Sequence, residues 1–301
     1  MTSNQNKNFF NKKKILITGA SGFIGRNLLD HISKYNCKIF ALYKSSKLRS
    51  YKKNVSLIKS DLTKNIPKRI LKIKFDIVIH LAGSKADRKS MMKEKQILNG
   101  ILIDRNIINF SVKNGVTNFF YASTAGVYDV NDKFYSEKKI SINYDADGIY
   151  GLTKLIGEDV LYRSFKKNDL NICRFFSIYG NDSKTIINIW GKKIKNNQKV
   201  KIWGDGKTIR SWIHISDVIS GIIKILINKN KNIFYNLGSN EKLSLNTIFK
   251  TIKKRYPKSK SKKILYKEIS SGPKNRFTNS ENLKKIGWKQ KIKLKEGIKL
   301  I

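Results

Sequence analysis

Three glycines near the start of the chain constrain its fold more than any other feature. The segment ILITGASGFIGR places Gly19, Gly22 and Gly25 between an apolar run and a stretch with helical periodicity. Gly19 permits a sharp turn after a strand, and Gly25 lets the following helix pack closely against that strand. The segment therefore predicts a buried strand, a tight turn and a helix.

The rest of the first half repeats this alternation of apolar runs and helical patterns. Apolar strands that are separated by helices specify a parallel sheet covered on both faces. The predicted fold is therefore α/β, a doubly wound parallel sheet of the Rossmann type with a smaller C-terminal lobe. Strands are expected over 14–18, 38–43, 55–60, 75–82, 118–123 and 171–176, and helices from the turn to about Lys34, over 95–114 and over 148–168.

The pattern loosens after Gly180. We expect the main domain to span 12–180, with 209–238 returning to it, and the smaller lobe to contain 181–208 and 239–301. The later segments predict a helix over 185–195, a strand over 200–203, a strand end running into a helix over 213–227, a strand over 233–238 and two helical segments after Leu245.

The formal net charge of +42 comes from 63 Lys and Arg residues against 21 Asp and Glu residues. A strongly positive field attracts polyanions, so binding of nucleic acid is one interpretation. The lysines are spread along the whole chain, however, and arginine, which suits bidentate contacts with phosphates and bases, is scarce. We therefore interpret the charge as solvated surface lysine and expect no nucleic-acid partner. A non-catalytic dinucleotide- or RNA-binding protein of the same fold is kept as the alternative function.

The two cysteines, Cys37 and Cys173, lack the spacing and the neighbours of metal ligands. They predict neither a disulfide nor a metal site, and they favour a cytoplasmic location. No apolar run approaches the ~18 residues that a membrane span needs, so we expect none. The opening stretch, rich in Asn and Lys, does not have the apolar core of a secretory signal.

The glycine turn also predicts a ligand. Gly22 would let the backbone approach a pyrophosphate, and the N-terminus of the following helix would supply N–H groups and a positive dipole end. The G-x-x-G-x-x-G spacing resembles the extended short-chain dehydrogenase/reductase family, of the NAD-dependent epimerase/dehydratase type. The resemblance extends from about Lys14 to the C-terminus. It implies an NAD(P)-dependent enzyme similar to nucleotide-sugar epimerases.

This resemblance implies further contacts with the cofactor. Asp61 matches the acid that touches the adenine ring, and the run His80–Gly83 matches the strand end beneath the dinucleotide. The implied cofactor-binding residues are Gly19, Ser21, Gly22, Phe23, Ile24, Gly25, Lys44, Asp61, Leu62, Leu81, Ala82, Gly83, Tyr150 and Lys154.

The identity of the dinucleotide depends on the end of the second strand. An acid there would grip the ribose 2′-hydroxyl of NAD, whereas a basic residue favours the 2′-phosphate of NADP. No acid follows Tyr43; Lys44 does, with Lys47 and Arg49 beyond it. We favour NADP(H), with the alternative that Lys44 is one more solvated lysine.

Tyr150 and Lys154 have the spacing that places two side chains on one face of a helix. A free tyrosine has a pKa near 10, and a nearby ammonium would stabilise its phenolate for proton transfer at a sugar hydroxyl. In the extended family, a strand that ends in Ser-Thr before Val-Tyr delivers a hydroxyl to the reacting oxygen. The matching segment here identifies Thr124, with Ser123 beside it. Tyr150, Lys154, Thr124 and Ser123 are therefore the implied catalytic residues, and Glu158 matches a frequent family residue.

The residues after Thr124 narrow the reaction. Dehydratases of this family carry an Asp-Glu pair there, whereas this chain has Ala125 and Gly126, which cannot transfer protons. Dehydration is therefore disfavoured. Hydride transfer at a sugar carbon, with C4 as the expected position, remains: epimerisation through a transient ketone, or net reduction of a keto-sugar.

Segments of the smaller lobe resemble the parts of the family that contact the substrate. The implied substrate is a nucleotide-diphosphate sugar, and we expect a homodimer. Ser177 stands where the family usually has Asn, and Arg210 suits the diphosphate because its planar guanidinium can donate two hydrogen bonds. The implied substrate-binding residues are Ser177, Trp203, Arg210 and Arg276.

Overall fold

Seven parallel strands form the main sheet, in the order β11-β6-β5-β4-β1-β2-β3. The computed structural model describes residues 3–46, 48, 51, 53–84, 94–129, 135, 137–140, 148–228, 233–266 and 275–301. The strands are β1 (Lys14–Thr18), β2 (Lys38–Tyr43), β3 (Val55–Lys59), β4 (Ile77–His80), β5 (Phe119–Thr124), β6 (Leu170–Phe175) and β11 (Phe234–Leu237). This sheet confirms the predicted α/β fold.

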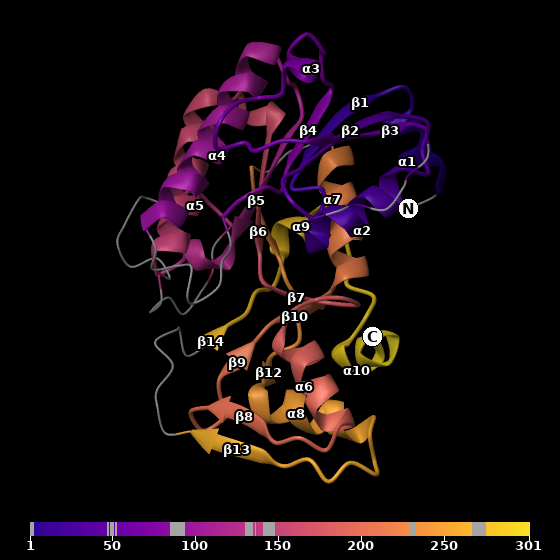
Figure 1. Ribbon diagram of the computed structural model, residues 1–301, viewed down its shortest axis with the longest axis vertical. Helices are drawn as coiled ribbons and strands as arrows, with labels where there is room; N and C mark the ends of the chain where they lie inside the picture. The colour runs from indigo at the N-terminus through magenta and orange to yellow at the C-terminus, as the bar shows by residue number, and fades with distance from the viewer. Residues whose placement is uncertain are drawn as a thin grey trace.

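Successive side chains of a strand point to opposite sides of the sheet, and the inner strands β4 and β6 are buried along their whole length, whereas the edge strand β3 is only partly buried. In β1, Ile15 and Ile17 lie in the core on one face of the sheet, whereas Leu16 lies in the core on the other face. Helices therefore cover both faces of the sheet (Figure 1). Around it lie α1 (Ser3–Phe10), α2 (Phe23–Ile32), α3 (Lys68–Leu71), α4 (Glu94–Asn114), α5 (Gly148–Ser164), α7 (Ile215–Ile227) and α9 (Glu281–Lys285).

A second group of elements lies below the main sheet in Figure 1. Its strands form small sheets: β7 pairs with β10, β8 pairs with β13, and β9 pairs with both β12 and β14. The strands are β7 (Ser177–Tyr179), β8 (Val200–Trp203), β9 (Ile209–Arg210), β10 (Trp212–His214), β12 (Leu243–Ser244), β13 (Lys263–Tyr266) and β14 (Asn275–Arg276). The helices are α6 (Ile186–Lys195), α8 (Leu245–Lys254) and α10 (Leu294–Gly297), and a separate apolar core includes Ile187, Trp190, Ile202 and Ile248.

The chain returns to the main sheet after crossing this second group. β11 pairs with β6, α7 packs against α2, and α9 packs against β11. The exact limits of the two lobes stay a prediction.

Several elements differ from the sequence prediction in their bounds. α5 ends at Ser164, not near 168, because Lys166 is extended and leads through a short 3-10 turn, η2 (Lys167–Asp169), into β6. The stretch before β1 forms α1, which composition does not predict. Phe10 at its end is fully buried, with its ring stacked 5.1 Å from that of Tyr35.

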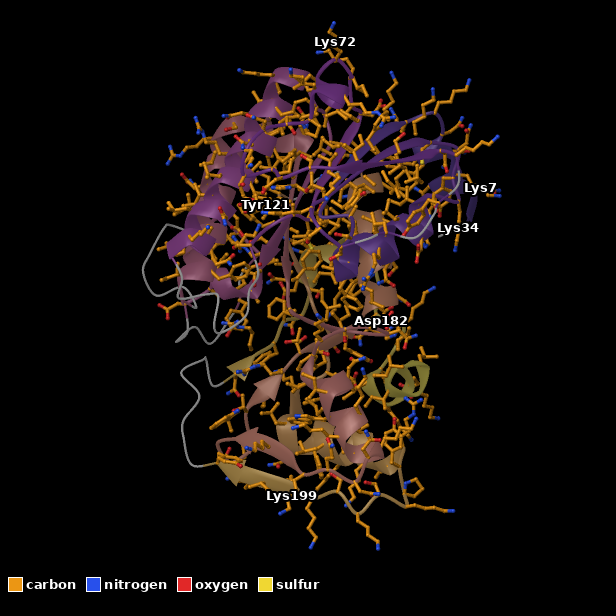
Figure 2. All side chains as sticks on the ribbon, viewed as in Figure 1. Lys7, Lys34, Lys72, Tyr121, Asp182 and Lys199 are labelled. Carbon is orange, nitrogen blue, oxygen red and sulfur yellow. The ribbon has the colours of Figure 1, made fainter. Side chains whose placement is uncertain are left out.

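The positive charge is distributed over the surface. In Figure 2, Lys72 points outward at the top of the molecule, Lys199 at the bottom, and Lys7 and Lys34 together at one side. The labelled lysines thus give no sign of one binding stripe.

Candidate active site

The glycine turn follows β1 and leads directly into α2. Gly19 has a φ of +67°, and a Cβ there would lie 2.7 Å from the backbone N of Ala82. A Cβ on Gly25 would overlap the carbonyl oxygen of Gly19. Neither position admits a side chain, so the turn is held tightly against both α2 and the end of β4.

The turn lies at the switch point of the sheet, because β1 pairs with β2 on one side and with β4 on the other. Ligands of open α/β sheets bind in the crevice beside such a point. Gly22 is the N-cap of α2, and Phe23 and Ile24 begin its first turn, with Ser21 just before. Such a turn offers N–H groups and a positive dipole end to an anion. These residues fit the phosphates of a dinucleotide.

The segment after β4 lies between the turn and Lys154. The N–H of Ala82 donates to Thr18 Oγ1 at 3.1 Å, and the N–H of Leu81 donates to the carbonyl oxygen of Thr18 at 3.3 Å. A Cβ on Gly83 would lie 3.4 Å from Lys154 Nζ. The predicted floor of the cofactor site and the predicted catalytic lysine are thus adjacent.

Lys44 and Asp61 form an ion pair at the ends of β2 and β3, with 2.9 Å between Lys44 Nζ and Asp61 Oδ2. The backbone N–H and the hydroxyl of Thr63 donate to Oδ1 at 3.1 and 2.8 Å. The hydrogen bond from Lys44, followed by those from Thr63, lowers the pKa of Asp61 to about 2. Leu62 beside it is buried. Asp61, the acid expected to contact the adenine, is therefore paired with Lys44, the lysine expected to contact a 2′-phosphate. Lys47 and Arg49 lie outside the described residues.

β5 ends in two hydroxyl residues with different surroundings. Ser123 is buried, and its Oγ donates to Glu158 Oε1 at 2.5 Å. Thr124 caps the 3-10 turn η1 (Ala125–Val127), where its Oγ1 accepts from the N–H of Gly126 at 3.1 Å. The Ser123 proton is thus committed to Glu158, whereas the Thr124 hydroxyl still has a proton to donate.

Tyr150 and Lys154 lie in the first turns of α5, which packs against η1. A Cβ on Gly126 would lie 3.5 Å from Thr124 Oγ1 and 3.6 Å from the Cα of Gly151. The start of α5 and the end of β5 therefore meet at the carboxyl edge of the sheet. Tyr150 is partly exposed there, whereas Lys154 is only 4% exposed.

Tyr121 and Asp104, which no sequence motif identifies, lie beside Lys154. Tyr121 donates its hydroxyl to Asp104 Oδ2 and accepts from Lys154 Nζ at 3.2 Å, and Figure 2 shows it in the interior. Burial, and then the charge of Asp104, raises the pKa of Tyr121 well above its ordinary value, so it keeps its proton. The available sequence clue was an acid on the apolar face of α4, beside Ile103 and Ile107.

A second buried network holds α5 at Glu158, in the middle of the helix. Arg174 is fully buried and donates Nε and Nη2 to the two oxygens of Glu158 at 3.0 and 2.6 Å. Its Nη1 donates to Tyr128 Oη at 3.1 Å, and Tyr128 donates to Asn236 Oδ1 at 2.8 Å. This network ties α5 to β6 and β11 and fixes the helix that carries Tyr150.

The predicted substrate residues lie in the second group of elements. Arg210 in β9 and Arg276 in β14 are register partners on neighbouring parallel strands. Trp203 ends β8, is 43% exposed, and has its ring 5.1 Å from that of Tyr266 in β13. Ser177 begins β7 and pairs in register with Trp212. The structure therefore brings the two arginines together and places Trp203 on a different small sheet.

Within the ranges that the structure describes, no group of three His, Cys, Asp or Glu side chains could hold a metal ion. None of the helices in those ranges is both long enough and apolar enough to cross a membrane.

The sequence profile of the NAD dependent epimerase/dehydratase family matches residues 15–238. The chain belongs to this family. The match begins in β1, before the glycine turn, and ends directly after β11, so it contains the main sheet and the Thr124, Tyr150 and Lys154 cluster.

Relatives within the NAD dependent epimerase/dehydratase family differ in their reactions. A GDP-mannose 3,5-epimerase of Arabidopsis thaliana is 25% identical, over 95% of this chain and 80% of its own length. A dTDP-D-glucose 4,6-dehydratase of Dictyostelium discoideum is 30% identical, over 77% of this chain and 59% of its own length. Family membership alone therefore does not choose between epimerisation and dehydration.

A solved structure of the same fold is that of UDP-glucuronic acid 4-epimerase from Bacillus cereus, in complex with UDP-glucuronic acid and NAD. It is 24% identical, with a TM-score of 0.83 over 95% of this chain and 97% of that one. The fold of the epimerase/dehydratase family thus extends through both groups of elements described here.

Proposed function

We propose that this chain is a nucleotide-sugar epimerase that uses NAD(P) and acts at a sugar carbon, with C4 as the expected position. The observation that supports the proposal is that the start of α5, which carries Tyr150 and Lys154, meets the end of β5 at Thr124, with Lys154 Nζ next to Gly83. In this arrangement a bound nicotinamide dinucleotide supplies the hydride acceptor and donor.

Each residue of the cluster has a proposed role. Tyr150 takes the proton of the sugar hydroxyl as its oxygen becomes that of a transient ketone, and returns the proton when the ketone is reduced. Lys154 stabilises the phenolate by its charge and holds the nicotinamide ribose. Thr124 donates to the reacting oxygen, a role that Ser123 leaves to it because the Ser123 hydroxyl is committed to Glu158.

The residues after Thr124 favour epimerisation over dehydration. Ala125 and Gly126 form the first turn of η1, where neither can act as acid or base. Epimerisation needs proton transfer at a single oxygen, which Tyr150 can perform alone. Among the relatives, the GDP-mannose 3,5-epimerase matches over 95% of this chain, which supports epimerisation without supporting the C4 position.

Net reduction of a keto-sugar is the second candidate, because Lys44 favours NADP(H). Its ion pair with Asp61 weakens that argument, since the charge of Lys44 is already balanced. NAD is bound in the structure of the Bacillus cereus epimerase. We therefore rank epimerisation first and leave the choice of dinucleotide to experiment.

The substrate is proposed to be a nucleotide-diphosphate sugar. Arg210 and Arg276 would bind the diphosphate, since they project from paired positions of β9 and β14. Trp203, exposed at the end of β8, offers an aromatic face to the base. Ser177 would contribute a hydroxyl to substrate binding, at the position where the family usually has the side-chain amide of Asn.

A homodimer is proposed on the basis of the outer faces of α4 and α5, which pack side by side. Leu98 and Val112 on α4, and Val160 on α5, are all more than 40% exposed. A second copy would bury these apolar groups. Cys37 and Cys173 are both buried free thiols, which suits the proposed cytoplasmic location.

The test is turnover of UDP-glucose and UDP-glucuronic acid, followed by chromatography of the sugar nucleotides. Tyr150→Phe should lower turnover by about 10²–10⁴-fold and leave dinucleotide binding intact. Tyr162→Phe, an exposed tyrosine on the same helix, is the matched control. Near-normal turnover by Tyr150→Phe would sink the proposed mechanism.

A second measurement separates the two candidate reactions. The protein is denatured after purification, and any released dinucleotide is identified. Retained NAD(H), with turnover that needs no added cofactor, supports an epimerase; stoichiometric consumption of NADPH supports a reductase.

A further inference from the structure

Asp104 is a buried carboxylate that the proposed mechanism does not yet use. It lies on α4 and is 4% exposed. Its Oδ1 lies 3.0 Å from His80 Nε2 and 3.6 Å from Lys154 Nζ, and its Oδ2 accepts from the Tyr121 hydroxyl. Groups from β4, β5 and α5 thus converge on one side chain.

His80 connects this carboxylate to the glycine turn. Burial lowers the pKa of His80, so the ring is neutral. Its Nε2 must then donate to the ionised Asp104, which leaves Nδ1 to accept from the Thr18 hydroxyl at 2.6 Å. Thr18 Oγ1 in turn accepts from the N–H of Ala82. A continuous chain of hydrogen bonds therefore runs from the floor of the cofactor site to Asp104.

Lys154 is held at the other end of this chain. Its Nζ donates to the Tyr121 hydroxyl and lies 4.4 Å from the centroid of the Tyr121 ring. A buried ammonium favours losing its proton unless an anion compensates it. Burial alone would raise the pKa of Asp104, but the charge of Lys154, followed by the hydrogen bond from His80, lowers it overall.

Asp104, Tyr121 and Lys154 are closely packed against α5. A Cβ on Gly157, one turn after Lys154, would overlap the Tyr121 hydroxyl and lie 2.9 Å from Asp104 Oδ2. Helix α5 can approach Asp104 and Tyr121 this closely because Gly157 has no side chain.

We infer that Asp104 is a positioning residue, which keeps Lys154 charged and fixed beneath Gly83 for its contact with the dinucleotide. The inference rests on the role of Lys154 in the proposed function. Asp104 acts through Lys154 and touches neither cofactor nor sugar. Its negative charge, more than its hydrogen bond with Tyr121, carries the effect.

The experiment is a double-mutant cycle of Asp104→Asn and Lys154→Met, with Tyr121→Phe as the control that removes a hydroxyl and keeps the charge. Binding of NADH is followed by fluorescence, and the folding equilibrium by urea denaturation between pH 5 and pH 10. Neither readout needs sugar turnover, so the inference can fail while the proposed function stands, and the reverse.

Asp104→Asn should weaken NADH binding by about tenfold and lower the folding equilibrium constant by about 100-fold or more at neutral pH, because an ammonium is left buried without its carboxylate. Lys154→Met should also lower the folding equilibrium constant, and this loss should shrink as the pH falls and Asp104, now buried without its ammonium partner, takes up a proton. Among the residues that the structure describes, the other ionisable groups that act on Asp104, Lys154 and Tyr121 include His80, Tyr150 and Glu158.

The double variant should be more stable than either single variant, and in the Lys154→Met background Asp104→Asn should no longer change NADH affinity. If Asp104→Asn does not fold at neutral pH, recovery of folding in the double variant supports the inference, and failure of both overturns it. Additive effects, or an equal loss of NADH affinity from Tyr121→Phe, would also overturn it.

Discussion

Arg210 and Arg276 stand opposite each other on parallel strands β9 and β14, although more than sixty residues separate them in the sequence. Paired positions on neighbouring strands present their side chains on the same face of a sheet. Two guanidinium groups on one face favour an anionic ligand with two charges, such as a diphosphate. The pairing of β9 with β14 thus brings together Arg210 and Arg276, which belong to two separate segments of the sequence.

Replacing these arginines should weaken substrate binding and leave the chemistry nearly intact. Arg210→Ala and Arg276→Ala should each raise KM by about 10–100-fold, since each removes charge-assisted hydrogen bonds worth about 1.5–3 kcal/mol. Steady-state kinetics with a UDP-sugar would measure this. Arg69→Ala, at an exposed position of α3, is the control. A fall in kcat with unchanged KM would contradict the assignment to the diphosphate.

Gly157→Ala should destabilise the protein by about 1–3 kcal/mol, because the added methyl group overlaps the Tyr121 hydroxyl. Gly191→Ala, in the middle of α6, has no neighbouring atom within 4 Å and should stabilise it by up to about 1 kcal/mol. Urea denaturation of both variants gives the comparison. Equal effects of the two substitutions would show that the crowding at Gly157 is not real.

Lys44→Ala should raise the pKa of Asp61 from about 2 toward the ordinary carboxyl value, because the leading cause of the low value is the hydrogen bond from Lys44. NMR titration of the carboxyl carbon would report it. Because the pair is exposed, little stability should be lost. If Lys44 also binds a 2′-phosphate, affinity for NADPH should fall much more than affinity for NADH. An equal change for both would remove Lys44 from the choice of cofactor.

Val160→Lys should convert the proposed dimer to a monomer, since a charge placed in an apolar contact must be desolvated. Size-exclusion chromatography with light scattering would show the mass. Ile189→Lys, at a similarly exposed isoleucine on α6, should leave the mass unchanged. A monomeric mass for the wild-type protein would contradict the proposed dimer.

The parts of the fold with the clearest periodic pattern were predictable from the sequence. β1 and β2 have the expected bounds because their apolar runs are buried on both faces and end at polar or turn residues. β9, β12 and β14 escaped prediction because each has two residues, too few for a periodic pattern.

The candidate site was likewise only partly predictable from the sequence. Thr124, Tyr150 and Lys154 follow from local motifs, since spacing within one strand end or one helix can be seen in the sequence. Asp104 and Tyr121 could not be placed so, because their roles depend on contacts between α4, β5 and α5 that only tertiary packing creates.

Asp104 also forms part of the wall of an outer groove between α4 and α5, together with Ile101, Thr153, Ile156 and Val160. One carboxylate therefore faces the reactive lysine on one side and a surface recess on the other. In the proposed dimer, a small molecule seated in that recess would compete with the second copy of the chain for this face, and with neither the cofactor nor the sugar.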